Sequence, residues 1–193
     1  MTTFISYNKA RRIAAANISP LTRVETVGID DASGRVMAET VVAGLSVPAF
    51  DRAAMDGYAV KSIDIVDATR QSPRELKLLG RLHAGDTPKT AVKAGGCIQV
   101  ATGAVMPRGS DAVVMIEDTE VGNGVVKVFK PVSAGANISP QGEDIKEGDI
   151  ILEAGVILNA GQIGALAALG LTECRVYAKP VVAILSSGEE VAA

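Results

Sequence analysis

The most informative stretch of this sequence is VPAFDRAAMDGYAV, residues 47–60. Two acids, Asp51 and Asp56, lie in a largely apolar run, and Asp56 is followed directly by Gly57. Asp-Gly is a turn dipeptide, because glycine adopts positive φ without steric cost and aspartate can bond its own backbone. We therefore predict a turn that leads into a short strand over 57–61. Asp56 is then either a simple turn cap or a carboxylate held rigidly as a metal ligand or electrostatic trigger.

The composition describes a folded chain with few aromatic side chains. Its 193 residues can bury one good core or two small ones. The net charge is −3, from 19 basic and 22 acidic residues, and like charges form no run. A nucleic-acid surface needs a basic stripe, so nucleic acid is not an expected partner. The same balance gives no electrostatic attraction to anionic lipid.

Neither the cysteines nor the apolar stretches indicate export or membrane insertion. Cys97 and Cys174 lie far apart in no metal-ligand or redox spacing, so each is expected to be a small buried hydrophobe. The N-terminus lacks the pattern of a signal peptide. The longest smooth apolar stretch, residues 163–171, is too short to cross a bilayer. The sequence predicts a cytoplasmic protein with no membrane partner.

Two segments of mixed α/β character flank the middle of the chain. Their predicted elements are helices over 6–17, 31–39 and 159–169, and strands over 23–29, 148–152 and 174–177. Asn159 suits the N-cap of the last helix, and Gly170 suits its C-terminal stop. Ile163, Leu166 and Ala167 form one apolar face with Gly170. Small residues on this face allow close backbone approach, either within the chain or in a dimer.

The middle of the chain is predicted to be rich in short strands. The expected strands cover 57–61, 75–83, 97–101 and 111–117, and a hairpin covers 121–132. Asn123-Gly124 between valine-rich arms is a strong signal for the hairpin turn. Short strands with frequent glycines predict a small open barrel or sandwich.

The sequence ends with VVAILSSGEEVAA, residues 181–193. Residues 181–185 are apolar on both faces, which is typical of a parallel strand covered by helices. The following Ser-Ser-Gly-Glu-Glu is what a strand-to-helix turn of an α/β unit looks like. One interpretation is a further α/β domain that is truncated after its first strand and turn. The alternative is that residues 181–185 pair with the edge of an existing sheet.

Residues 47–60 resemble the motif Pro-x-Phe-Asp-x-Ser-Ala-Met-Asp-Gly-Tyr-Ala of the molybdopterin molybdenumtransferases, the family that includes the E domain of gephyrin. Ala53 stands where that family usually has serine. Further segments resemble the family in the same order, namely GRLHAGDT at 80–87, ATGAVMP at 101–107, DAVVMIEDT at 111–119, GEDI at 142–145 and LSSGEE at 185–190. The last has Glu189 where the family has aspartate. The resemblance spans nearly the whole chain.

The resemblance implies a fold of mixed α/β and β type. It implies an elongated α/β dimerisation region from 1–46 and 140–180, an inserted β-rich, barrel-like domain at 47–139, and the truncated start of an α/β pterin-binding domain at 181–193. It also implies the insertion of molybdate into adenylylated molybdopterin, with release of AMP, in molybdenum cofactor biosynthesis. In the family the active site lies between the β-rich domain of one subunit and the pterin-binding domain of its partner. A homodimer is therefore expected, and the isolated chain is expected to be inactive.

The resemblance also assigns residues to this chemistry. It implies catalytic roles for Asp56, Thr102 and Asp144, substrate binding by Gly103, Ser187 and Gly188, and metal binding by Glu190. Molybdate and the adenylylated pterin are both anions, so Mg²⁺ with carboxylate and water ligands is the expected cofactor. Thr102 would supply a hydroxyl, and Gly103 would let the backbone approach an anion. On spacing alone, each of these residues also has a structural reading as a turn or loop residue.

Two other functions remain open. The first is a non-catalytic dimerising scaffold or interaction module, which the small-residue helix over 159–169 favours. The second is an unrelated Mg²⁺-dependent phosphohydrolase that uses Asp51 and Asp56. The acids around Glu117 are interpreted as a solvated loop. His83, the only histidine, cannot build a multi-histidine metal site.

Overall fold

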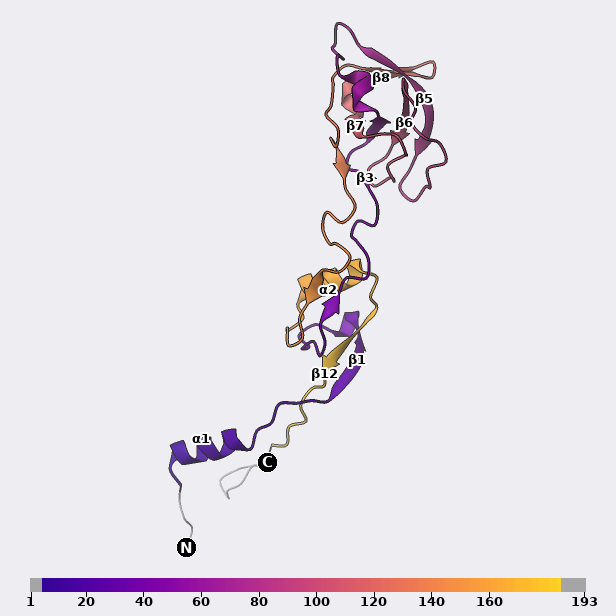
Figure 1. The fold of residues 1–193 in the computed structure, drawn as a ribbon. Helices are drawn as coiled ribbons and strands as arrows, with labels where there is room; N and C mark the ends of the chain where they lie inside the picture. The colour runs from indigo at the N-terminus through magenta and orange to yellow at the C-terminus, as the bar shows by residue number, and fades with distance from the viewer. Residues whose placement is uncertain (1–4, 185–193) are drawn as a thin grey trace, which may run out of the picture. The chain divides into compact units, whose positions relative to one another are not determined.

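The computed structural model describes residues 5–184 (Figure 1). The chain forms two compact units. The first unit consists of two segments, one up to Val41 and one from Ile150 onward, and the second unit, Val42–Asp149, is inserted between them in the sequence. The sequence placed the inserted domain at 47–139. Backbone bonds extend the unit beyond that range, because Ala43 N donates to Asp149 O at 2.8 Å and Val47 N donates to Ile145 O at 2.7 Å.

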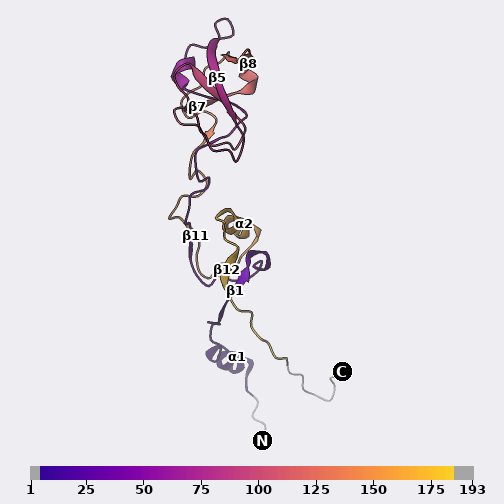
Figure 2. The same ribbon diagram turned by 90° about the vertical axis from the view of Figure 1, so that its right-hand side faces the viewer.

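A six-stranded sheet with the order β7-β4-β6-β5-β9-β8 forms the inserted unit. The strands are β4 Gly57–Val60, β5 Arg74–Leu82, β6 Gly96–Val100, β7 Ala112–Met115, β8 Thr119–Gly122 and β9 Val125–Val128. Neighbouring strands are antiparallel except β5 and β6, which are parallel. Figures 1 and 2 show the sheet curling on itself like part of a barrel. The expected β-rich, barrel-like middle is therefore confirmed.

The β8–β9 hairpin has the turn that the sequence predicted. Asn123 and Gly124 both have positive φ, 49° and 76°, and Gly122 pairs with Val125 across the turn. Two successive positive φ values give a turn whose twist matches that of the strands, and Asn-Gly accepts this conformation at low cost. The hairpin expected over 121–132 is confirmed with different bounds, because its first strand begins at Thr119 and its second ends at Val128.

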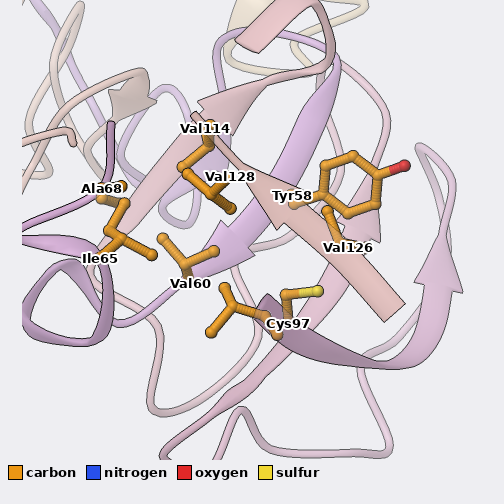
Figure 3. Close-up of a cluster of buried hydrophobic side chains, with 10 residues drawn as sticks. Tyr58, Val60, Ile65, Ala68, Cys97, Val114, Val126 and Val128 are labelled. Carbon is orange, nitrogen blue, oxygen red and sulfur yellow. The ribbon is translucent and has the colours of Figure 1, made fainter. Parts of the chain in front are cut away.

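Two apolar clusters cover the two faces of this sheet. Figure 3 shows the first, which consists of Tyr58, Val60, Ile65, Ala68, Leu76, Cys97, Ala112, Val114, Val126 and Val128. The second consists of Ala53, Ala59, Val92, Ile98, Val100, Ala104 and Val113. Every residue of β4 is buried, because successive side chains alternate between the two clusters. The end of the 47–60 segment is thus the central strand of the unit.

Cys97 is a buried member of the first cluster, as expected. Burial raises the pKa of its thiol to about 12. The thiolate is the reactive form of cysteine, so Cys97 is inert at neutral pH. Burial also raises the pKa of Cys174, which lies in the core of the other unit.

The first unit is built around one antiparallel strand pair and one helix. Strand β1, Val24–Gly28, pairs with β12, Glu173–Tyr177, and helix α2 covers Ala160–Ala168. Its core cluster consists of Ala32, Met37, Leu152, Leu158, Leu166, Cys174 and Val176. The boundary between the two units is marked by a short strand pair, β2 Val41–Val42 with β11 Ile150–Leu152. A second short pair, β3 Arg52–Ala53 with β10 Ile138–Ser139, lies within the inserted unit.

Helix α2 begins and ends at the residues that the sequence indicated. Asn159 Oδ1 accepts hydrogen bonds from the N–H groups of Gly161 and Gln162, and Gln162 Oε1 accepts one from Asn159 N at 2.8 Å. This reciprocal arrangement is a capping box. Gly170 has a φ of 73° just past the helix end, where a residue with a Cβ would be strained. The side chain of Ala167 is exposed, so it does not share the packed face of Leu166 within this chain.

Helix α1, Tyr7–Ala16, confirms the helix expected over 6–17 and is capped by Ser6. It buries none of its residues. The helix expected over 31–39 is wrong. A 3-10 turn covers Ile29–Asp31, Gly34 has a φ of 73°, and the next residues form bridges, with Met37 opposite Val176. Pairing with partners distant in sequence overrides the local helical preference there.

The strand expected over 181–185 does not form in the part that the structure describes, residues 181–184. Val181 and Ile184 are each 90% exposed. A strand needs hydrogen-bonding neighbours, and no strand among residues 5–184 pairs with this segment. Leu185 and the following residues of the proposed strand and turn lie outside the described residues. Over residues 5–184, neither helix has the length and apolar character needed to traverse a bilayer.

Candidate functional site

Asp56 and Thr102 lie next to each other at one end of the β4–β6 pair. Asp56 precedes β4 and Thr102 follows β6, and Gly57 lies opposite Val100 in the antiparallel register. This register brings the start of one strand to the end of the other. Asp56 Oδ1 accepts hydrogen bonds from Thr102 N at 2.7 Å and from Thr102 Oγ1 at 2.8 Å. The structure therefore joins two of the three residues that the resemblance assigned to catalysis.

The hydrogen bonds to Asp56 favour its ionised form. The backbone N–H of Thr102, followed by its hydroxyl, lowers the pKa of the Asp56 carboxyl below its ordinary value, because both donors favour the charged form. The carboxylate is exposed, and among residues 5–184 only Oδ1 accepts a protein hydrogen bond. Oδ2 of Asp56 thus presents a negative charge that a cation or a polar substrate group can contact.

Gly103 shapes the loop that carries Thr102. It has a φ of 83°, a conformation that side chains with a Cβ rarely adopt. Its N–H donates to Ala53 O at 2.8 Å, and Ala53 N donates to Ala104 O at 2.9 Å. These bonds fasten the loop to β3. Because the N–H of Gly103 is already bonded, the proposed contact of Gly103 with substrate has to involve close approach rather than this donor.

A small cavity of about 150 Å³ opens beside Asp56. Its polar lining residues are Asp56, Arg81, His83 and Gln99. Ile116 also lines it, and Ile116 N donates to Asp56 O at 3.2 Å. Apolar side chains near Asp56 in sequence or space are exposed, with Met55 at 46% and Ile116 at 43%. The carboxylate thus lies beside a small hollow with both polar and apolar lining and beside exposed apolar groups.

Arg81, Gln99 and His83 were not assigned to the site from sequence. Arg81 and Gln99 belong to β5 and β6, which pair in parallel with a register shift between Leu78 and Arg81. A β-bulge of this kind leaves no clear signature in the sequence. His83 stood out only as the single histidine. No local pattern could have placed these three side chains beside Asp56.

Asp144 lies on a different loop of the inserted unit. Its N–H donates to Val47 O at 3.0 Å, and its side chain is exposed. The same loop is fastened by Gln141 N, which donates to Asp51 Oδ1 at 2.8 Å. Within residues 5–184, no hydrogen bond links Asp144 to Asp56 or Thr102. The convergence of Asp56, Thr102 and Asp144 on one catalytic site stays a prediction.

The contribution of the described residues to a metal site is limited. No group of three or more histidine, cysteine, aspartate or glutamate side chains among residues 5–184 is arranged to hold a metal ion. The pairing of Asp51 with Asp56 in a phosphohydrolase site therefore gains no support, since Asp51 instead fastens a loop. Mg²⁺ is commonly held by one or two carboxylates together with substrate phosphates and water. The expected Mg²⁺ stays a prediction, and Ser187, Gly188 and Glu190 lie outside the described residues.

The comparisons with known proteins agree with this architecture. The family described as the MoeA N-terminal region (domain I and II) matches residues 5–170. The molybdopterin molybdenumtransferase of Staphylococcus aureus strain Mu50 is 36% identical over 165 residues, which cover 86% of this chain and 39% of that protein. That of Staphylococcus epidermidis strain RP62A is 36% identical over 164 residues, which cover 85% and 39%.

A solved structure gives the same result for the fold. The crystal structure of the molybdopterin biosynthesis moeA protein from Pyrococcus horikoshii OT3 superposes with a TM-score of 0.82 at 36% sequence identity. The match covers 92% of this chain and 47% of that one. The chain therefore belongs to the MoeA N-terminal region family, as the sequence motifs predicted. It spans about two fifths of the length of the curated relatives that it matches.

Proposed function

We propose that this chain is the N-terminal part of a molybdopterin molybdenumtransferase. The complete protein would insert molybdate into adenylylated molybdopterin and release AMP during molybdenum cofactor biosynthesis. The proposal is supported by the family membership over residues 5–170 and by the names of the relatives. The single observation that carries it is the exposed Asp56 carboxylate, which Thr102 holds in place through two hydrogen bonds beside a small cavity.

Asp56 and Thr102 would act as one polar unit in this reaction. Thr102 orients the carboxylate through Oδ1, and Oδ2 remains for a substrate-bound water or cation. Mg²⁺ would be held jointly by carboxylate and phosphate oxygens, the ligands that this cation commonly takes. Asp144, Gly103, Ser187, Gly188 and Glu190 keep their proposed roles in catalysis, substrate binding and metal binding.

The isolated chain would supply only part of the site. A single carboxylate beside a cavity of about 150 Å³ is too small a surface to enclose an adenylylated pterin, since ligand pockets usually hold roughly 300–1,000 Å³. The exposed Met55 and Ile116 suit contact with further protein surface. The working protein is therefore proposed to be a cytoplasmic homodimer in which another domain completes the site.

The test is an exchange of the matching region between relatives. Residues 5–170 replace the corresponding segment of the Staphylococcus aureus protein, and AMP release is measured with adenylylated molybdopterin and molybdate. We expect the chimera to turn over and the isolated chain to show no turnover. A folded chimera without activity would contradict the proposed contribution of these residues, and full activity of the isolated chain would contradict the shared site.

The second candidate is the dimerising scaffold, which one observation favours. Helix α1 buries none of its residues, and Tyr7 and Ile13 are 76% and 48% exposed. An amphipathic helix without a packed face is stable only when another surface covers it. A scaffold of this kind requires that the described residues associate without the remainder of the relatives' length.

An Ala167→Glu variant tests whether helix α2 contributes to such an association. Because Ala167 is exposed, we expect the variant to keep the melting temperature of the wild type within about 2 °C. A charge in a dimer interface should shift the sedimentation coefficient to that of a monomer. Ala154→Glu, on an exposed turn of the same unit, is the matched control. A wild-type chain that sediments as a monomer would exclude the scaffold.

A further inference from the structure

A second and larger cavity lies next to the one beside Asp56. Its volume is about 480 Å³, and its polar lining includes Arg81, Thr87, Lys89 and Thr90. Arg81 also lines the cavity that contains Asp56. Both cavities belong to the inserted unit, and Arg81 marks the place where they adjoin.

The sheet fixes the position of Arg81. Tyr58 of β4 lies opposite Gln99 of β6, and Gln99 lies opposite Arg81 of β5. Residues opposite each other on paired strands share one face of the sheet, so Arg81 starts from the face of Tyr58 and Gln99. Leu82 and Ile98, which line the larger cavity, belong to the apolar cluster on the other face, and Arg81 lines both cavities. Figure 3 shows the Tyr58 hydroxyl pointing away from the other labelled members of its apolar cluster. Burial raises the pKa of Tyr58, and the nearby positive charge of Arg81 opposes that rise.

The charge in the larger cavity is not balanced by protein groups. Among residues 5–184, neither Arg81 nor Lys89 forms an ion pair, whereas Arg35, Arg74 and Arg175 each do. Asp86 is the single carboxylate of the lining, and its Oδ2 already accepts a hydrogen bond from His83 N at 2.8 Å. The lining of this cavity thus contains two cationic residues, Arg81 and Lys89, together with the hydroxyl-bearing Thr87 and Thr90.

This combination suits an oxyanion. A guanidinium presents parallel N–H donors that match two oxygens of a tetrahedral oxyanion, and an ammonium adds a point charge. Threonine hydroxyls can donate to the remaining oxygens. A positive group is also required for an anionic ligand to approach the carboxylate of Asp56, because like charges repel.

We propose that Arg81 and Lys89, with the hydroxyls of Thr87 and Thr90, form an oxyanion subsite adjoining Asp56. The inference rests on the proposed function and names the part of the site that neutralises the anionic reactant. The ligand is a dianionic tetrahedral group, either the phosphoryl group of a nucleotide-bearing substrate or free molybdate. Arg81 binds it from the wall shared by the two cavities, and Lys89 binds it from within the larger one.

Binding to the full chain tests the subsite without any turnover. Inorganic phosphate, AMP, molybdate and adenosine are titrated separately, and amide chemical shifts of the 80–90 loop and β6 are followed by NMR. We expect Arg81→Gln and Lys89→Gln to weaken phosphate binding about tenfold each, because hydrogen bonds to charged groups contribute more than neutral ones. Arg70→Gln and Lys77→Gln remove the same charges outside both cavities and should change the affinity less than twofold.

The ligands distinguish the two sources of the oxyanion. If AMP and phosphate bind with similar affinity and adenosine does not bind, the subsite recognises a phosphoryl group. If molybdate also displaces phosphate at equal concentration, the subsite accepts free oxyanions as well. Wild-type affinity in both Arg81→Gln and Lys89→Gln, with unchanged melting curves, would overturn the proposal. The same holds if no titration saturates. Neither result would affect the proposed function, which is tested separately by turnover of the chimera.

Discussion

Replacing Gly57 by alanine should lower the melting temperature of this chain by about 10 °C, the expected effect of a cost of roughly 3 kcal/mol or more in a unit of this size. A Cβ at Gly57 would lie 2.0 Å from the carbonyl oxygen of Val114 and 2.9 Å from its carbonyl carbon. Both atoms belong to the backbone of β7, the strand paired with β4. The strands would have to separate locally, which would disturb the pairing and the apolar clusters on both faces. Thermal unfolding followed by circular dichroism measures the effect.

The matched control is Gly122→Ala on β8. A Cβ at Gly122 meets nothing within 4 Å, and Gly122 also pairs in a regular antiparallel register. Alanine there should be neutral or slightly stabilising, because it restricts the unfolded chain. Equal losses in both variants would show that the close approach of β4 and β7 is not what requires glycine in the Met-Asp-Gly-Tyr turn.

Replacing Asp56 by asparagine in the chimera should reduce molybdate-dependent AMP release about a hundredfold, the usual size of the loss when a charged or hydrogen-bonding group of a preorganised site is removed. Asparagine keeps an Oδ1 acceptor for both donors of Thr102, so the loop should remain in place. What it removes is the negative charge. The comparison therefore separates the charge of Asp56 from its shape, and the assay measures the turnover number with saturating reactants.

Asp111→Asn is the control for Asp56→Asn. The Asp111 carboxylate is exposed and accepts hydrogen bonds from Ser62 N at 2.6 Å and Ser62 Oγ at 2.9 Å, much as Asp56 binds Thr102. It lines neither cavity. We expect Asp111→Asn to retain nearly full turnover. A comparable loss in both variants would mean that such Asp–Ser/Thr contacts matter for folding alone.

The pH dependence follows from the lowered pKa of Asp56. Its folded-state pKa is below the unfolded value, so its contribution to stability is fully present above the unfolded pKa, about 3.9, and is lost as the pH falls through the folded value. The difference in melting temperature between the wild type and Asp56→Asn should therefore vanish in strong acid and should not change with pH above about pH 5. A difference that changes between pH 6 and 8 would point to another group.

The features that the sequence predicted correctly are those that depend on neighbouring residues. The Asn123-Gly124 turn needs only two residues that accept positive φ, and the ends of α2 need only Asn159 and Gly170. The family motifs also assigned both Asp56 and Thr102 to catalysis, and the structure shows these two residues in contact. Their contact itself could not be derived locally, because it depends on the register of β4 against β6.

The errors have the opposite origin. Residues 31–39 carry a helical composition, but bridges such as Met37 to Val176 draw them into an extended path. Arg81 was overlooked because its position depends on a register shift in the parallel β5–β6 pair. The exposure of Ala167 likewise depends on which neighbours the rest of the chain provides. In each case partners remote in sequence decide the outcome.

The insertion of one unit within another sets an order for biosynthesis. Strand β1 lies near the N-terminus, yet its partner β12 is made only after the whole of Val42–Asp149 has been translated. The β4–β9 strands, in contrast, find all their partners within their own stretch. Domains generally fold as units while the ribosome is still elongating the chain. The inserted sheet should therefore be complete before β12, the partner of β1, has been synthesised. Ribosome-bound nascent chains ending soon after Asp149 should therefore already protect the amides of β4 from hydrogen exchange.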